Sequence, residues 1–137
     1  MGNKTDTAII YSSFMGTTRK VANYLAKTLD ADVFDLKLQT NIDMTDYSKI
    51  IIGTGVHAGN PYGKVTRFIE DNREKLLDKE VYLFISCMYK GEKAETQCED
   101  IAQTYQISDA VYFSTRGEKN EAGVCKDVDT FAERMGQ

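Results

Sequence analysis

Residues 7–22 read Thr-Ala-Ile-Ile-Tyr-Ser-Ser-Phe-Met-Gly-Thr-Thr-Arg-Lys-Val-Ala. An apolar run ends at Tyr11, a hydroxyl-rich loop with one glycine follows, and a helical pattern begins almost at once. This layout directs backbone N–H groups and hydroxyls at one point beside a helix N-terminus, where an anion is favoured. The stretch predicts a phosphate-binding loop, although the same hydroxyls could merely cap the helix.

The composition is that of an ordinary globular domain. The 137 residues are 42% hydrophobic and 28% charged, which predicts a single domain over residues 1–137. The net charge of -4 argues against binding to nucleic acid or to an anionic membrane. No apolar run approaches the roughly 20 residues of a membrane span, and the N-terminus lacks the apolar segment of a secretion signal.

The cysteines predict neither a disulfide framework nor a metal site. Cys87, Cys98 and Cys125 are odd in number and form no Cys-x-x-Cys pair, so reduced thiols in a cytoplasmic protein are the simplest account. One histidine and dispersed cysteines give no metal-ligand spacing. Cys98 lies at core spacing on a predicted helix, and we assign no catalytic thiol.

Five apolar segments predict strands, and a helical pattern follows almost every one of them. The strands are expected at residues 8–11, 33–38, 49–53, 81–86 and 110–114. Residues 39–48 read as a polar loop, and residues 54–62 contain two glycines and a proline, which predicts irregular structure. One helical pattern runs from Gly63 to Leu76, and the closing helix is expected to include Val124.

Alternating strands and helices predict an α/β fold, with a parallel sheet covered by helices on both faces. The first, third and fourth strands are continuous apolar runs, which favours the order 2-1-3-4-5 because it places these three inside. Ligands of such sheets bind at the carboxyl ends of the strands, at the switch point between strands one and three. The loops at 12–18 and 54–62 leave those two strands.

The phosphate loop lacks the signatures of larger nucleotides. No Gly-x-x-x-x-Gly-Lys-Ser/Thr motif and no Gly-x-Gly-x-x-Gly motif occurs, which argues against nucleoside triphosphates and dinucleotides. A cradle of N–H and hydroxyl groups without a neutralising lysine suits one terminal monophosphate.

Residues 11–22 resemble the FMN phosphate loop of the flavodoxin family, and residues 46–54 resemble that family's third strand and its approach to the flavin ring. The resemblance spans essentially the whole chain and implies a flavodoxin-like five-stranded parallel sheet that binds FMN. Met15 departs from the pattern, since the family usually has Thr or Ser there. One side-chain phosphate donor is therefore missing, unless Thr17 replaces it.

The resemblance implies three cofactor-binding loops. Their expected FMN contacts are Ser12, Ser13, Phe14, Met15, Gly16, Thr17 and Thr18 in the first loop, Thr54, Gly55, Val56, His57, Ala58 and Gly59 in the second, and Cys87, Met88, Tyr89, Lys90 and Gly91 in the third.

Two of these loops carry specific expectations for the ring. His57 stands where the family commonly has a stacking Trp or Tyr, and a protonated imidazole there would favour the anionic reduced flavin. Gly55 and Gly59 suit the loop peptide that reorients in flavodoxins when flavin N5 is protonated. Tyr89 is the candidate to cover the other face of the ring.

The function expected from this resemblance is a small electron carrier that works with reductase and acceptor proteins. Asp43, Glu92 and Glu95 are candidates to steer such partners. The alternative is a flavin-dependent oxidoreductase, since residues 55–65 also resemble flavodoxin-like protoporphyrinogen oxidases and related quinone reductases. Those oxidases carry an added stretch after the last strand, whereas only Thr115 to Gly123 stands here, so the carrier is favoured and enzymatic activity stays open.

Overall fold

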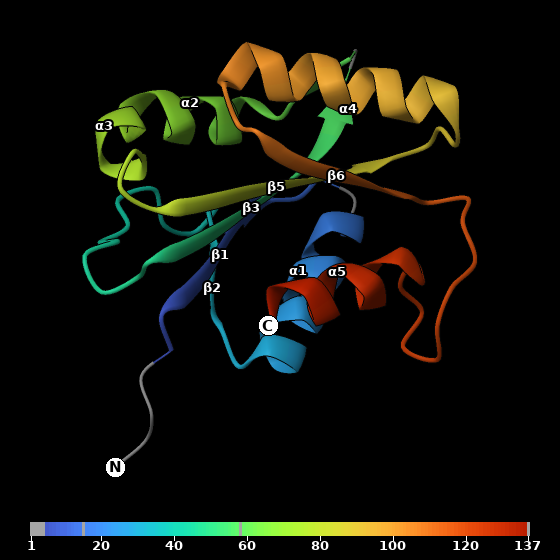
Figure 1. Ribbon diagram of the computed structural model, residues 1–137, viewed down its shortest axis with the longest axis horizontal. Helices are drawn as coiled ribbons and strands as arrows, with labels where there is room; N and C mark the ends of the chain where they lie inside the picture. The colour runs from blue at the N-terminus through green and yellow to red at the C-terminus, as the bar shows by residue number, and fades with distance from the viewer. Residues whose placement is uncertain (1–4, 15, 58, 137) are drawn as a thin grey trace.

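A parallel sheet forms the centre of the structure, and helices cover both of its faces (Figure 1). The computed structural model describes residues 5–14, 16–57 and 59–136. In chain order the elements are β1 (Thr7–Ser12), α1 (Thr17–Leu29), β2 (Asp32–Asp35), β3 (Lys49–His57), β4 (Asn60–Pro61), α2 (Gly63–Asp71), α3 (Arg73–Leu76), β5 (Glu80–Cys87), α4 (Glu92–Tyr105), β6 (Asp109–Ser114) and α5 (Asp127–Met135).

The order of the strands confirms the predicted topology. The main sheet runs β2-β1-β3-β5-β6 with every neighbouring pair parallel, which is the expected order 2-1-3-4-5 of the five parallel strands. The short β4 pairs antiparallel with β3 alone. The carboxyl ends of all five parallel strands therefore lie at one edge of the sheet.

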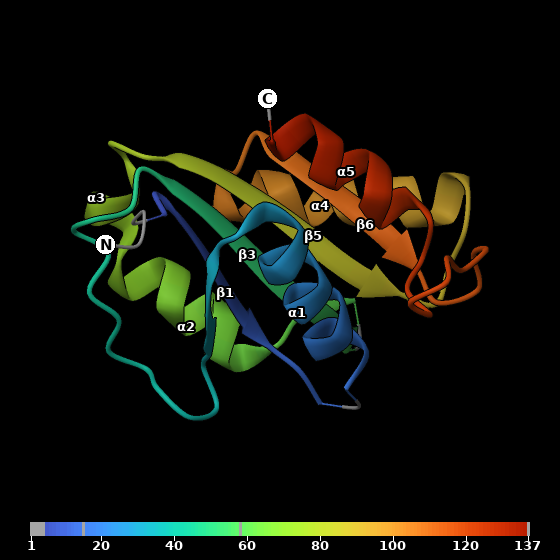
Figure 2. The same cartoon turned by 90° about the horizontal axis from the view of Figure 1, so that it is seen from below.

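Two hydrophobic cores explain why the central strands are apolar at consecutive positions. Helices α1 and α5 cover one face, and α2, α3 and α4 cover the other (Figures 1 and 2). Ile50 and Ile52 point into the core beneath α2 and α4, whereas Ile51 points into the core beneath α1 and α5. Because successive side chains alternate between two buried faces, Ile50, Ile51 and Ile52 are all apolar.

The prediction of irregular structure at residues 54–62 is wrong. β3 continues to His57, and the chain turns back so that His57 pairs with Asn60 and Val56 with Pro61. Gly59 supplies the positive φ of 81° at this hairpin turn. Pro61 is tolerated because β4 lies at an edge, where a missing N–H breaks no ladder.

Three other boundaries differ from the sequence prediction. β2 ends at Asp35, because the N–H groups of Leu38 and Gln39 both donate to the Asp35 carbonyl and close a turn. The helical pattern of residues 63–76 divides at Asn72, whose side-chain amide donates to the Phe68 carbonyl and terminates α2. α5 begins at Asp127, so Val124 packs from the preceding loop instead.

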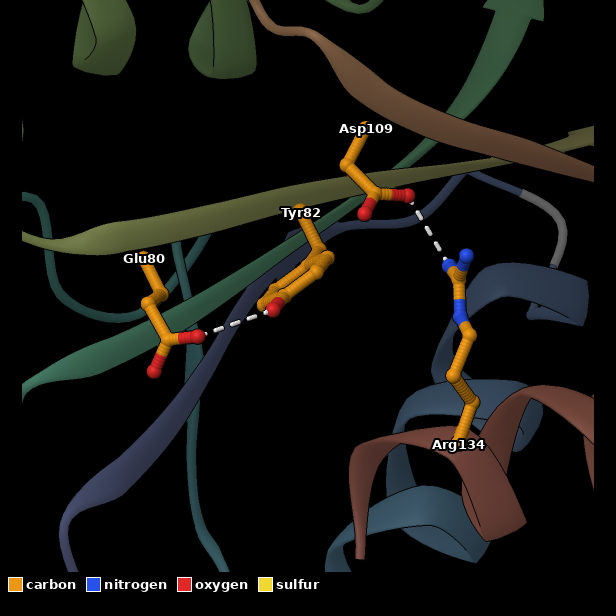
Figure 3. Close-up of polar contacts among 4 residues, drawn as sticks. All are labelled: Glu80, Tyr82, Asp109 and Arg134. Atoms are coloured by element: carbon orange, nitrogen blue, oxygen red, sulfur yellow. Dashed lines mark hydrogen bonds and ion pairs between the residues drawn. The ribbon is translucent and has the colours of Figure 1, made fainter. Parts of the chain in front are cut away.

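Polar contacts fasten the amino ends of β5 and β6 on the α5 side (Figure 3). Arg134 of α5 donates to the Asp109 carboxylate at 2.9 Å. The Tyr82 hydroxyl donates to Glu80 at 3.1 Å, and the Tyr82 ring packs edge-on against Phe131. These contacts hold α5 to the sheet at the end away from the strand carboxyl termini.

A second polar network joins α1, α5 and the loop between β6 and α5. The Tyr24 hydroxyl donates to one Asp129 carboxylate oxygen, and the Asn120 amide donates to the other at 3.0 Å. The Asn120 side-chain oxygen accepts from the N–H groups of Ala122 and Val124 at 2.9 Å and 3.2 Å. The loop at residues 115–126 is therefore fixed in place by two helices.

Replacing Gly53 with alanine should destabilise the fold. A methyl group on Gly53 would lie 2.2 Å from the Phe84 ring, which is fully buried. Overpacking of this kind costs about 1–3 kcal/mol in the free energy of unfolding, measured by urea denaturation. Gly63→Ala is the control, because nothing lies within 4 Å of its methyl position, and its effect should stay within about 0.5 kcal/mol. Equal losses in the two variants would contradict the close approach of β3 and β5.

Removing the Tyr24 hydroxyl should raise the pKa of Asp129. Hydrogen bonds from Tyr24 and Asn120 hold that pKa below the ordinary 3.8. Because the folded-state pKa is lowered, the bonded carboxylate stabilises the fold above pH 3.8 and loses this effect as the pH falls through the folded-state value. NMR titration of the carboxyl carbon should show the rise in Tyr24→Phe and none in the control Tyr82→Phe. An unchanged pKa of Asp129 in Tyr24→Phe would show that the hydrogen bond between Tyr24 of α1 and Asp129 of α5 is absent in solution.

Candidate functional site

The segments predicted to form a site meet at one edge of the sheet. Ser12 pairs with Thr54, and Gly55 pairs with Ser86, so the carboxyl ends of β1, β3 and β5 lie side by side. The segments that follow them emerge together at the right-hand end of the sheet in Figure 1. Met15 and Ala58, two of the expected contacts, lie outside the described residues.

The turn between β1 and α1 leaves the start of α1 open to a ligand. Gly16 adopts a left-handed conformation with φ 93°, and its N–H donates to the Ser13 side-chain oxygen at 3.1 Å. No side chain of the described residues caps the N-terminus of α1. Unpaired N–H groups at a helix start attract an anion, so the geometry favours the phosphate interpretation over simple capping.

The hydroxyls of this turn differ in their access to a ligand. Thr17 is exposed and Ser13 is half-buried, whereas Ser12 and Thr18 are buried beneath the turn. The Ser13 oxygen accepts the Gly16 N–H, which leaves the Ser13 O–H free to donate outward. Ser13 and Thr17 are therefore the side chains of this turn that can reach a phosphate group.

The hairpin after β3 uses two of its predicted site residues internally. The Thr54 hydroxyl donates to the Gly55 carbonyl at 2.7 Å and accepts from the Tyr62 N–H at 3.0 Å. A methyl group on Gly55 would lie 2.3 Å from the Tyr62 hydroxyl, so a glycine is needed there for packing. Of the two glycines expected to let the loop peptide reorient, Gly59 is the one that retains conformational freedom, because its φ is 81° and open space surrounds it.

The loops expected to hold a flat ring carry exposed apolar side chains. Of the six large hydrophobic residues exposed in the described part of the chain, Phe14, Met88 and Tyr89 belong to the predicted loops. The Lys93 ammonium lies 4.0 Å from the centre of the Tyr89 ring. His57 is exposed at the end of β3. Apolar side chains left uncovered at a strand-end edge are typical of a ligand site.

Among the other residues of the predicted loops, Cys87 is poorly placed to contact a ligand through its side chain. Cys87 is buried, burial raises the pKa of its thiol, and its sulfur lies 3.6 Å from the Tyr89 carbonyl oxygen as a hydrogen-bond donor. Lys90 is exposed, Val56 is half-buried, and Gly91 precedes α4 with φ 66°. Cys87 therefore presents a protonated, shielded thiol, and only the backbone around it is suited to contact a ligand.

The candidate steering residues lie at opposite ends of the molecule. Glu92 and Glu95 occupy the first turn of α4, directly after the third loop. Asp43 lies near Lys79, which donates to the neighbouring Met44 carbonyl and directly precedes β5. The suggestion that Asp43 steers partners toward this edge is therefore wrong, because Asp43 sits beside the amino end of β5.

A pocket of about 320 Å³ lies next to the phosphate loop, on the face covered by α1 and α5. It is lined by Gly16, Thr17, Lys20, Val21, Ser86, Phe113, Ser114, Thr115, Lys119, Gly123, Val124 and Cys125. Two lysines thus lie beside a loop whose own sequence predicts no neutralising lysine. Lys20 could have been found from its place one turn into the helix, whereas Lys119 comes from a loop about a hundred residues away.

The described residues contain neither a metal-binding cluster nor a membrane-spanning helix. Among the described residues, no group of three His, Cys, Asp or Glu side chains is placed to hold a metal ion. None of the helices in that part of the chain combines the length and the apolar character needed to cross a membrane.

Solved structures share this fold at low sequence identity. Oxidised Flavodoxin 1 from Bacillus cereus is 17% identical, with a TM-score of 0.67 over 93% of this chain and 94% of that one. A WrbA-like flavodoxin from Agrobacterium tumefaciens is 16% identical, with a TM-score of 0.67 over 97% and 94%. A flavoprotein from Lactobacillus acidophilus NCFM, solved in complex with FMN, is 17% identical, with a TM-score of 0.64 over 79% and 93%. At such identities these likenesses establish the fold alone.

Sequence comparison identifies the family. No curated protein sequence matches the chain. The family model described as a flavodoxin domain matches residues 8–125, a range that includes all three predicted loops. This match and the strand order lead to the same conclusion: the chain belongs to the flavodoxin family.

Proposed function

We propose that this protein binds FMN and carries electrons between partner proteins. The observation that carries the proposal is the uncapped start of α1, placed at the same sheet edge as the exposed Tyr89 and Met88 side chains. FMN consists of a phosphate group joined by a sugar chain to a flat apolar ring, so it needs both features at one edge. Bound FMN supplies the electron-transfer chemistry, and the protein supplies binding, orientation and electrostatics.

The residues present suit such a ligand. The first-turn N–H groups of α1 and the Ser13 and Thr17 hydroxyls would hold the phosphate through charge-assisted hydrogen bonds. Tyr89 and His57, from the loops after β5 and β3, would cover the ring. The shielded ring would keep water away, and its uncovered rim would remain available for electron exchange with a partner.

The proposed partners are a reductase and an acceptor protein. Glu92 and Glu95 lie in the first turn of α4, interspersed with Lys90 and Lys93, and these two carboxylates are the groups that would attract a basic partner surface. Cys87, Cys98 and Cys125 are free and buried, which supports the proposal that the carrier works in the reducing cytoplasm.

A flavin-dependent oxidoreductase is the alternative. The flavodoxin-like protoporphyrinogen oxidases carry an added stretch after the last strand, whereas residues 115–126 form a short loop held by its own hydrogen bonds here. This favours the carrier. Rapid consumption of NAD(P)H or of a quinone by the FMN-loaded protein, without an added reductase, would favour the enzyme instead.

Thr17→Val should weaken FMN binding. The substitution removes the exposed hydroxyl at the start of α1 while keeping the shape of the side chain. A lost hydrogen bond to a charged phosphate costs about 1.5–3 kcal/mol, which corresponds to roughly a tenfold or greater rise in Kd. Quenching of FMN fluorescence measures the Kd directly.

The matched control is Thr104→Val, which changes an exposed threonine in the last turn of α4. Its Kd for FMN should equal that of the wild type. A wild-type protein that neither contains FMN nor binds it at micromolar concentration would refute the proposed function. Release of FAD in place of FMN on denaturation would refute the choice of cofactor.

A further inference from the structure

We propose that the pocket beside the phosphate loop is a second binding site, which takes a small molecule bearing a phosphate or carboxylate group. We call it the lysine pocket, after Lys20 and Lys119, and its lining residues are those given above. The proposal does not depend on the electron-carrier function, because the lysine pocket can be occupied with or without a flavin.

The lysine pocket is separate from the place expected for the flavin ring. Among the described residues, its lining includes none from the hairpin after β3 or from residues 88–91, and Gly16 and Thr17 are those that it shares with the phosphate loop. It lies instead against the carboxyl ends of β5 and β6, on the face covered by α1 and α5. A ligand there would be a neighbour of the flavin phosphate rather than part of the flavin.

The charge of the lysine pocket selects an anion. Among the described residues that line it, Lys20 and Lys119 are the only charged ones, although the whole chain has a net charge of -4. The Lys119 ammonium donates to the Thr115 carbonyl at 2.9 Å, which leaves two of its three N–H groups for a ligand. The Lys20 ammonium lies 2.7 Å from the place where a side-chain carbon on Gly123 would stand, so the glycine leaves room for it.

A buried hydroxyl without a partner points to the same ligand chemistry. Ser86 is 7% exposed, lines the lysine pocket, and is one of two residues in the described part of the chain with a buried side-chain oxygen or nitrogen that lacks a hydrogen bond. By strand alternation its side chain points to the same face as Phe84, which belongs to the core beneath α1 and α5. Buried hydroxyls normally have a hydrogen-bond partner, so an acceptor oxygen of a ligand in the pocket would supply the partner that the Ser86 hydroxyl lacks.

The walls of the lysine pocket are already in place. The Ser114 oxygen accepts the Arg116 N–H at 3.1 Å, which leaves the Ser114 O–H free to donate. Lys119 and Cys125 form an isolated antiparallel bridge. Together with the Asn120–Asp129–Tyr24 network, this bridge fixes the outer wall against α1. A preformed site loses little entropy on binding, and a volume of about 320 Å³ suits a small ligand.

The test is a titration of the FMN-loaded protein with inorganic phosphate, followed by amide NMR in a low-salt buffer free of other oxyanions. We expect saturable binding, with changes in the amide chemical shifts of Thr115 and Gly123. Lys20→Met and Lys119→Met should each raise the Kd at least about fivefold, because each removes a charge-assisted contact. Lys27→Met, on α1 but outside the pocket, should leave the Kd unchanged. Ser86→Ala should raise it at least about twofold.

Three outcomes would overturn the proposal. In the first, phosphate binds only the FMN-free protein and competes with FMN, which would assign both lysines to the flavin phosphate. In the second, Lys27→Met weakens binding as much as Lys119→Met does, which would reduce the effect to general charge attraction. In the third, neither phosphate nor malonate, the carboxylate probe, binds saturably. A protein that fails to bind FMN would refute the proposed function only, since the same shifts and variants test the pocket without flavin.

Discussion

The burial of the parallel sheet on both faces is the constraint on which the rest of the structure depends. Because β1, β3 and β5 are covered on both sides, their consecutive core residues are apolar and most of their polar residues lie toward the strand ends. Parallel pairing then aligns those ends at one edge, where Ser12 meets Thr54 and Gly55 meets Ser86. The candidate site follows from the architecture, since three loops from distant parts of the sequence must emerge together.

This constraint explains why so much of the fold is predictable from the sequence. Continuous apolar runs mark central strands, and the partly alternating segment at residues 33–38 marks an edge, so burial separates the three inner strands from the two outer ones. The errors occur where local hydrogen bonds decide the outcome. The Asp35 carbonyl closes a turn that shortens β2, and the Asn72 amide divides a helical pattern that hydrophobic spacing presents as continuous.

The site itself is less predictable than the fold, and glycine shows the reason. Gly55 and Gly59 look equivalent in the sequence, but Gly55 is required by the Tyr62 ring against it and Gly59 by a positive φ. Threonines show the same ambiguity, since Thr54 is bonded within the hairpin while Thr17 faces solvent. Residue type indicates which chemistry is present, whereas exposure and bonding partners, which depend on the fold, decide which groups can reach a ligand.

The net charge of the chain does not show how charged residues are distributed along the sheet edge. The α1–α5 side presents Lys20 and Lys119 in one pocket, whereas the start of α4 and the loop before it carry both signs of charge, with Glu92 and Glu95 beside Lys90 and Lys93. An anionic ligand is therefore favoured at the lysine pocket, while the start of α4 offers two carboxylates to basic groups of a partner. Because the two charged groups serve different faces of the sheet, occupation of the lysine pocket and docking of a partner at α4 need not exclude one another. The mildly acidic net charge describes the chain as a whole and neither of these surfaces.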